Sequence, residues 1–321
     1  MPLRTQPKET SKQYSDFIQP FMIDHSSIRG RMVRVSKALD TILNAHNYPL
    51  AVSYHLAEQI VIACMLSATL DKGGILTVQA KGNGAVRFIV VDVMAGGTIR
   101  GYAEVNEEAL KKAIGKSKAK THPLSKIMGE GHMAVTFDEG NSKERYQGIV
   151  ELKGDSISEV FQGYFLQSQQ GEISVNVAVR APDNIHKKWS AGGVIIERMP
   201  SEGGKKQELT EEEREEIWKR TKLFMQTLKA NELLEENNTP QNLLYRLFNE
   251  DGVWVYKLQP IKAGCRCSRE RIRTVLKTIP KEELIESLDD GKMSVNCQFC
   301  NKTEVFTRAD INRLYRTTTK K

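Results

Sequence analysis

The chain has 321 residues, of which 40% are hydrophobic and 27% charged, and its formal net charge is +7. This length suggests two domains, and the composition is that of an ordinary globular protein with a sizeable core. The longest apolar run, residues 60–66, is far shorter than the ~20 residues that span a bilayer, and no secretory signal is visible, so we expect a cytoplasmic protein without a membrane partner.

The first two hundred residues alternate between helical and strand patterns. Residues 31–36 alternate like a strand, and Ser36 can cap the helix that follows. Residues 50–70 predict a longer helix. Gly82-Asn83-Gly84 joins two strand-like segments and is typical of a hairpin. Further strands and one helix follow, so we expect residues 15–200 to form one α+β domain built on a largely antiparallel sheet.

A helical linker is predicted for residues 201–262. Gly, Ser and charged residues at 200–207 indicate a hinge, and Thr210 with Glu213 then forms a capping-box pattern. Thr239 and Pro240 begin a second, short helix. Such short, charged helices are marginal without tertiary contacts, so the linker should be metastable. If it unfolds, its apolar stripe becomes available to other proteins. The stripe consists of Trp218, Phe224, Met225, Leu228, Leu243, Leu244 and Phe248.

Four of the five cysteines lie in two short pairs near the C-terminus, CRC at 265–267 and CQFC at 297–300. Four thiolates make a closed tetrahedral zinc site, and both pair spacings can turn two sulfurs toward one point. We therefore expect residues 263–318 to form a small zinc domain, held by Cys265, Cys267, Cys297 and Cys300. A unit this small has little core and would unfold on loss of the metal.

The same thiols also permit redox chemistry. A bond between Cys265 and Cys267 is geometrically possible but strained, and strained disulfides tend to be labile and regulatory. Zinc keeps the sulfurs as thiolates, the form that oxidants attack. Arginines 266, 269, 271 and 273 either favour the thiolates further or form a solvated helix face. Cys64, on the apolar face of a predicted helix, is expected to be a buried, inert thiol.

The chain resembles the heat shock protein 33 family, also called the 33 kDa chaperonin, over residues 15–316. A CxC pair followed after about thirty residues by CxxC is the hallmark of that family. The segments CRCSRERIRTVLKTIPKEEL, CQFCNKTEVFTRADI and LLYRLFNEDGVWVY fit its pattern, as do ERYQGIVELKGDSISEVFQGYFLQSQQ, SAGGVIIERMP and GILTVQAKGNG.

The resemblance implies a redox-regulated holdase chaperone that works without ATP. In the reduced state the four cysteines would hold one Zn²⁺ and the chaperone would be off. Oxidants would form Cys265–Cys267 and Cys297–Cys300 disulfides and release zinc. The linker would then unfold, and the protein would dimerise and bind unfolding client proteins, with the linker stripe as the candidate surface.

Two other functions compete with this interpretation. A zinc-ribbon nucleic-acid-binding protein is favoured by the net charge and the arginines after CRC, but residues 282–290 of the same unit are acidic. A thiol-disulfide oxidoreductase would place its CxxC at the start of a helix, whereas this one is predicted in a hairpin turn. Neither a Ser/His/Asp set nor an ATP site stands out, so we do not expect an enzyme.

Overall fold

In the computed structural model the chain divides into two compact units, Met1–Ala263 and Gly264–Lys321. The structure describes residues 14–315 except 25, 118, 120, 141–144, 169–170 and 200–209, and the side chains of 69 and 166–168 are also not described. The predicted hinge at 200–207 therefore lies outside the described residues. The boundary between a domain ending at 200 and a linker of 201–262 stays a prediction.

The first unit contains two six-stranded sheets, named sheet A and sheet B here. Sheet A has the order β10-β1-β2-β9-β8, with β11 also paired to β1, and sheet B has the order β12-β5-β4-β3-β6-β7. Sheet A comprises β1 (Phe17–Ile23), β2 (Ile28–Val35), β8 (Ile173–Arg180), β9 (Ser190–Arg198), β10 (Val253–Val255) and β11 (Gln259–Pro260). Sheet B comprises β3 (Ile75–Gly82), β4 (Val86–Met94), β5 (Thr98–Val105), β6 (Gly131–Asp138), β7 (Arg145–Glu151) and β12 (Lys262–Ala263).

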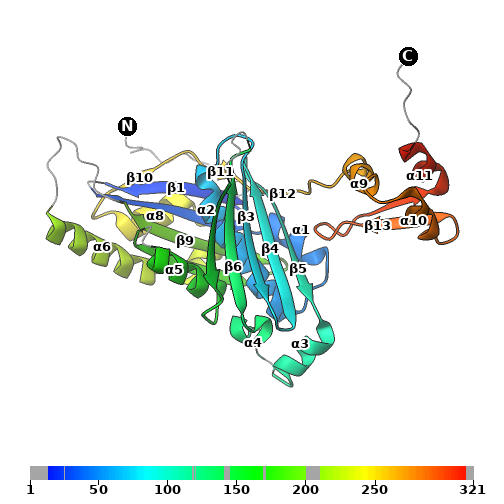
Figure 1. Ribbon diagram of the computed structural model, residues 1–321. Coiled ribbons are helices and arrows are strands. Elements are labelled where there is room, and N and C mark those ends of the chain that lie inside the picture. The colour runs from blue at the N-terminus through cyan, green and yellow to red at the C-terminus, as the bar shows by residue number, and fades with distance from the viewer. Residues whose placement is uncertain are drawn as a thin grey trace, which may run out of the picture. The chain divides into compact units, whose positions relative to one another are not determined.

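The expected α+β fold with antiparallel pairing is confirmed, although the strands divide between two sheets where the sequence predicted one. Each described pair of strands is antiparallel except β12 with β5. The predicted hairpin is β3–β4, and β6–β7 is a second one. Strands β3 to β6 run side by side, and the short helices α3 (Glu107–Ile114) and α4 (Leu124–Met128) lie beyond their ends (Figure 1). The sequence did not predict these two helices.

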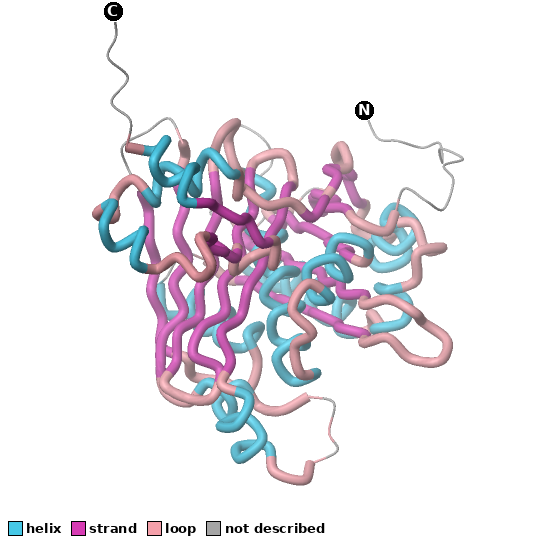
Figure 2. The backbone as a smooth tube through the Cα atoms, turned by 90° about the vertical axis from the view of Figure 1, so that its right-hand side faces the viewer, coloured by secondary structure: helices cyan, strands magenta, loops and turns pink. Residues whose placement is uncertain are grey.

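Helix α2 (Leu50–Leu66), extended by a 3-10 turn over Ser67–Thr69, lies in the core between the two sheets. It is apolar nearly all round and buried along most of its length, as expected for a helix that contacts protein on every side. Helices α1 (Lys37–Asn44) and α5 (Ile157–Ser168) pack beside it. In Figure 2 the long strands lie side by side, with helices packed beside them. Buried Gln59 donates to the carbonyls of Val78 and Ile89 in sheet B, which ties α2 to that sheet.

The N-terminus of α1 is capped by a residue that the sequence did not suggest. The side chain of Ser36 makes no capping hydrogen bond. Instead, the Asp16 carboxylate accepts from the backbone N–H groups of Ser36, Lys37 and Ala38 at 2.9–3.2 Å. A carboxylate is favoured at this position because it satisfies free N–H groups and complements the helix dipole. The cap therefore ties the start of β1 to α1.

Three helices from the predicted linker cover the outer face of sheet A. They are α6 (Glu211–Gln226), α7 (Ala230–Leu234) and α8 (Pro240–Phe248). The predicted capping box of Thr210 and Glu213 is present, and Thr239 accepts from the N–H of Asn242. The helices and the sheet share one cluster of buried side chains, in which Phe21 of β1 stacks on Phe248 at 5.7 Å. The linker helices therefore complete the core of the first unit.

Arg34 of β2 is the most deeply buried polar link between sheet A and these helices. Its side chain is 0% exposed, and its guanidinium donates to the carbonyls of Leu233 and Asn238, as well as to that of Tyr14. Among the described residues no carboxylate lies within ion-pair distance of it. Burial lowers the pKa of Arg34 to about 10, against the attraction of Glu236 and Glu235. Docking of the linker thus supplies backbone carbonyls for two of the three guanidinium nitrogens of Arg34.

Residues 253–263 pair first with sheet A and then with sheet B. Strands β10 and β11 pair with β1, and β12 pairs with β5. Gly97 permits this crossing because its φ is +78° and an added Cβ would lie 2.0 Å from the carbonyl oxygen of Pro260. Gly264 alone then separates this anchored segment from Cys265.

The second unit is small. It contains α9 (Arg269–Leu276), α10 (Lys281–Glu286), a hairpin of β13 (Lys292–Asn296) and β14 (Thr303–Thr307), and α11 (Arg308–Leu314). Its fully buried core consists of Leu276, Leu284, Phe306 and Ile311, with partly buried neighbours around them. No described helix of either unit is long and apolar enough to cross a membrane.

We predict that Arg34→Met loosens the linker while zinc is still bound. The substitution leaves the linker carbonyls of Leu233 and Asn238 without their donor, which should weaken docking of α6–α8 by about 2–4 kcal/mol. Hydrogen exchange of residues 211–248 in the reduced, zinc-loaded protein should therefore accelerate, while Arg87→Met, at an exposed position of β4, should leave it unchanged. Equal exchange in the two variants would contradict the assigned role of Arg34.

Candidate metal centre

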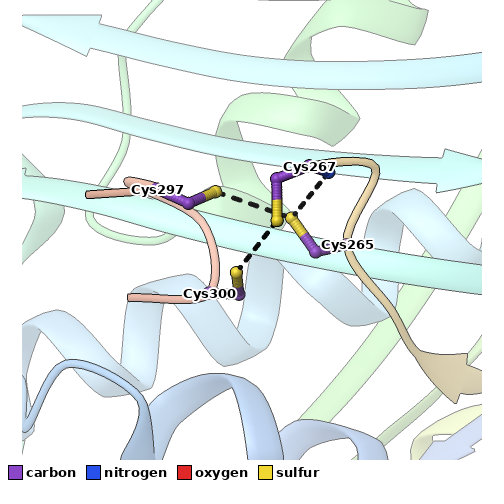
Figure 3. Close-up of side chains that lie close together, drawn as sticks. All are labelled: Cys265, Cys267, Cys297 and Cys300. Atoms are coloured by element: carbon purple, nitrogen blue, oxygen red, sulfur yellow. Dashed lines mark hydrogen bonds between the residues drawn. The ribbon is translucent and has the colours of Figure 1, made fainter. Parts of the chain in front are cut away.

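The four C-terminal cysteines lie together in the second unit. Their sulfur atoms all fall within 4.8 Å of one another, with Cys265 Sγ 3.6 Å from Cys297 Sγ and Cys267 Sγ 3.4 Å from Cys300 Sγ. Two come from the loop before α9 and two from the loop between β13 and β14, and their sulfurs point toward one another (Figure 3). All four are free thiols and half-buried.

Local backbone structure turns each pair inward. In the first pair, the N–H of Cys267 donates to Cys265 Sγ at 3.5 Å, and Ser268 then caps α9 as predicted. In the second pair, the N–H of Asn301 donates to the carbonyl of Cys297, which closes a turn at the end of β13. Asn301 has a φ of +55°, a conformation that Asn tolerates better than most residues. The CxxC therefore lies in a hairpin turn, as the sequence predicted.

The arrangement fits a tetrahedral zinc ion. Four sulfurs bound at about 2.3 Å from zinc are about 3.8 Å apart, close to the two shortest sulfur–sulfur distances here. All four donors are cysteines, the set found in closed structural zinc sites. The identity of the metal and the pairing of the thiols on oxidation stay predictions.

The thiols differ in acidity. Burial raises the pKa of Cys265, but the Cys267 N–H and the neighbouring thiols lower it more strongly, to about 7. Burial and the neighbouring sulfurs raise the pKa of Cys267, and burial is also the main cause of the raised pKa of Cys300. Several thiolates so close together repel one another, so a divalent cation is needed to keep all four ionised.

Two of the nearby arginines pair with carboxylates. The sequence had left open whether these arginines act on the thiolates or form a solvated helix face. Arg269 pairs with Glu304 at 2.9 Å and Asp310 at 3.2 Å, and it lies over the ring of Phe306. Arg273 pairs with Glu270 at 3.1 Å. Arg269 therefore holds α9 against β14 and α11, and so positions the loop that carries the first cysteine pair.

The candidate client-binding residues lie in the first unit. Phe224 is partly buried, and the other six (Trp218, Met225, Leu228, Leu243, Leu244 and Phe248) are buried against sheet A. Exposed apolar side chains near them include Leu223 and Tyr245. A client could therefore reach the stripe only after α6 and α8 leave the sheet. Cys64 is fully buried in α2, and burial raises the pKa of its thiol.

Comparisons with known proteins agree on one family. The chain matches the family model described as Hsp33 protein over residues 16–307. It is 34% identical over 292 residues to the 33 kDa chaperonin of Caulobacter vibrioides, covering 89% of this chain and 93% of that protein. It is 32% identical over 298 residues to the 33 kDa chaperonin of Escherichia coli, covering 92% and 94%.

A solved structure also shares the fold. The crystal structure of a 33 kDa chaperonin, described as a heat shock protein 33 homolog, from Thermotoga maritima matches with a TM-score of 0.77 at 22% identity. The match covers 94% of this chain and 97% of that one. It supports the mixed α+β architecture described above.

We predict that the reduced protein binds one zinc ion per chain and that Cys300→Ser abolishes stable binding. Because the second unit has so small a core, loss of zinc should also unfold α9–α11, with a loss of amide protection in residues 264–315. Metal analysis and hydrogen exchange measure the two effects. Cys64→Ala is the matched control and should keep its zinc. Zinc loss from Cys64→Ala but not from Cys300→Ser would contradict the assignment.

Proposed function

Because the chain belongs to the Hsp33 family, we propose that it is a chaperone whose activity is switched on by oxidation of its four-cysteine centre. Family membership supports the chaperone function itself. The single observation that carries the switch is the meeting of four free, half-buried thiols within 4.8 Å in a unit with almost no other core. In the reduced state these thiolates bind one zinc ion and keep the second unit folded.

Oxidation removes the ligands from the metal. Each disulfide forms as two thiolates give up two electrons to one hydrogen peroxide, which takes up two protons and leaves as two water molecules. We propose Cys265–Cys267 and Cys297–Cys300 as the pairs. Without thiolates the zinc leaves, and the binding free energy that stabilised the second unit is lost.

The linker is poised to respond because its docking on sheet A combines apolar burial with buried polar groups. Trp218 Nε1 is buried without a hydrogen-bond partner among the described residues, and so is one terminal nitrogen of Arg34. Each such group costs about 1–3 kcal/mol, which offsets part of the gain from burying the apolar stripe. Release of the linker would expose both this stripe and the sheet face beneath it.

We further propose that the activated protein holds unfolding client proteins without ATP and without catalysing a reaction, that it dimerises when oxidised, and that it works in the cytoplasm. The linker stripe and the outer face of sheet A are apolar over adjoining surfaces, which suits unfolded chains that expose apolar side chains. Nothing in the site favours nucleic acid as the partner, since two of the arginines beside the cysteines already pair with carboxylates.

Light scattering from a heat-denatured client protein tests the proposal. The chain should suppress aggregation after treatment with peroxide under mild heat, and should not do so when reduced and zinc-loaded. Replacing Cys265, Cys267, Cys297 and Cys300 by Ser removes the zinc ligands and prevents both disulfides, and so separates zinc loss from disulfide formation. Equal suppression by the oxidised and reduced native protein, or none by either, would rule out a redox switch, and salt-sensitive binding of nucleic acid would then favour the zinc-ribbon alternative.

Mass spectrometry of peptides from the oxidised protein tests the pairing. We predict disulfides within each short pair, because only one or two residues separate these cysteines along the chain and keep their sulfurs close as the centre opens. Cross-pair bonds, Cys265–Cys297 and Cys267–Cys300, would instead indicate oxidation within the folded centre, where those sulfurs are 3.6 and 3.4 Å apart. That outcome would contradict the proposed pairing.

A further inference from the structure

A cavity of about 170 Å³ lies within the first unit, and none of its lining residues belongs to the linker helices. It opens between the inner face of sheet A, helices α2 and α5, and the β6–β7 hairpin of sheet B. Its lining combines two arginines and one glutamate with a predominantly apolar wall. The lining residues are Arg29, Arg31, Leu66, Val135, Phe137, Tyr146, Phe161, Tyr164, Phe165, Ile173, Ile195 and Glu197.

The polar end of the cavity carries more positive than negative charge. Arg29 and Glu197 are directly opposite each other on β2 and β9 and form a two-pronged pair at 2.8 and 3.0 Å. Arg31 is only 7% exposed, yet its nearest carboxylate oxygen, also of Glu197, is 3.7 Å away. Among the described residues Arg31 has no hydrogen-bond partner, although its guanidinium carries five N–H donors.

Without a ligand, only water that enters through the cavity can bind the N–H donors of Arg31, whose charge is poorly solvated. Burial lowers the pKa of Arg31, with Arg29 acting in the same direction and Glu197 in the opposite one. One carboxylate shared between two guanidinium groups leaves one positive charge uncompensated in a poorly solvated place. A second anion arriving through the cavity would both neutralise that charge and satisfy the free donors.

The rest of the wall suits an aromatic body. Phe161 and Phe165 of α5 pack edge to face at 5.0 Å, and Tyr164 meets Tyr146 of β7 with their hydroxyl oxygens 3.2 Å apart. Gly148 allows Tyr164 to approach the hairpin, because an added Cβ would lie 2.1 Å from the tyrosine oxygen. An engineered cavity of about 150 Å³ with apolar walls holds benzene, so this cavity has room for one phenyl ring and a small group.

We propose that this cavity binds a small organic monocarboxylate with a phenyl-sized apolar body, its carboxylate on Arg31 and its ring among the aromatic side chains of α5 and β6. A planar carboxylate matches the geometry of the guanidinium group. Its single negative charge balances the one positive charge of Arg29 and Arg31 that Glu197 does not compensate. Inorganic phosphate would leave the aromatic wall uncovered, and a neutral arene would leave Arg31 without its counter-ion.

Isothermal titration calorimetry of the full-length, reduced, zinc-loaded protein with phenylacetate tests the site. We expect a dissociation constant between about 0.1 and 1 mM, in keeping with so small a ligand. Phenylacetamide has nearly the same shape without the charge and should bind at least about tenfold more weakly. This comparison uses only the native chain, so it stands whether or not any variant folds.

A pair of variants assigns the binding to Arg31. Arg31→Met should weaken phenylacetate binding at least about tenfold, while Arg87→Met, which removes an exposed arginine of β4, should leave it unchanged. Circular dichroism checks that both variants are folded. The proposal is wrong if phenylacetate does not bind at millimolar concentration, if the amide binds as tightly as the acid, or if folded Arg31→Met binds as the native chain does.

Discussion

Sheet A is apolar on both faces, and the rest of the first unit follows from the need to cover both. Along β2, Val33 and Val35 face α2, whereas Ile28 and Met32 face the other way. Helix α2 and sheet B cover the inner face, and the linker helices cover the outer one. A large side chain gains about 1.5–3 kcal/mol from full burial. The segment that the proposed switch would release is therefore part of the core of the first unit.

The second unit and the linker would have to open for different physical reasons. The second unit has four fully buried apolar side chains, too few to hold five short elements together without help from the metal. The linker has ample apolar contact, but its docking also leaves one terminal nitrogen of Arg34 and the indole N–H of Trp218 buried without a hydrogen-bond partner among the described residues. Apolar burial holds the linker down, and these polar groups reduce the net gain. Favourable apolar burial and unfavourable burial of polar groups partly cancel in the docking of the linker. A modest change in its surroundings can therefore release it.

The features that the sequence predicted correctly depend on residues that lie close together along the chain. The cysteine cluster was predictable because two residues three or fewer apart need only a short turn to meet, and the hairpin at Gly82-Asn83-Gly84 follows from turn chemistry. Contacts between distant segments could not be read in this way. The pairing of β1 with β10, the cap that Asp16 supplies to α1, and the division into two sheets all depend on residues far apart in the chain.

Strand β2 shows most clearly what a pattern leaves out. Residues 31–36 predicted a strand, and the structure has one there, but the pattern did not distinguish its arginines from ordinary solvated ones. Because side chains alternate along a strand, Arg31 and Arg34 face opposite sides of sheet A, and both are buried. Burying a guanidinium is unfavourable unless partners satisfy it. Carbonyl groups of the linker accept hydrogen bonds from Arg34. Arg31 has only Glu197, whose carboxylate is 3.7 Å away and also pairs with Arg29. The need to satisfy a buried guanidinium thus explains why the linker docks over Arg34. It is also the reason to propose an anion for the cavity at Arg31, on the other side of sheet A.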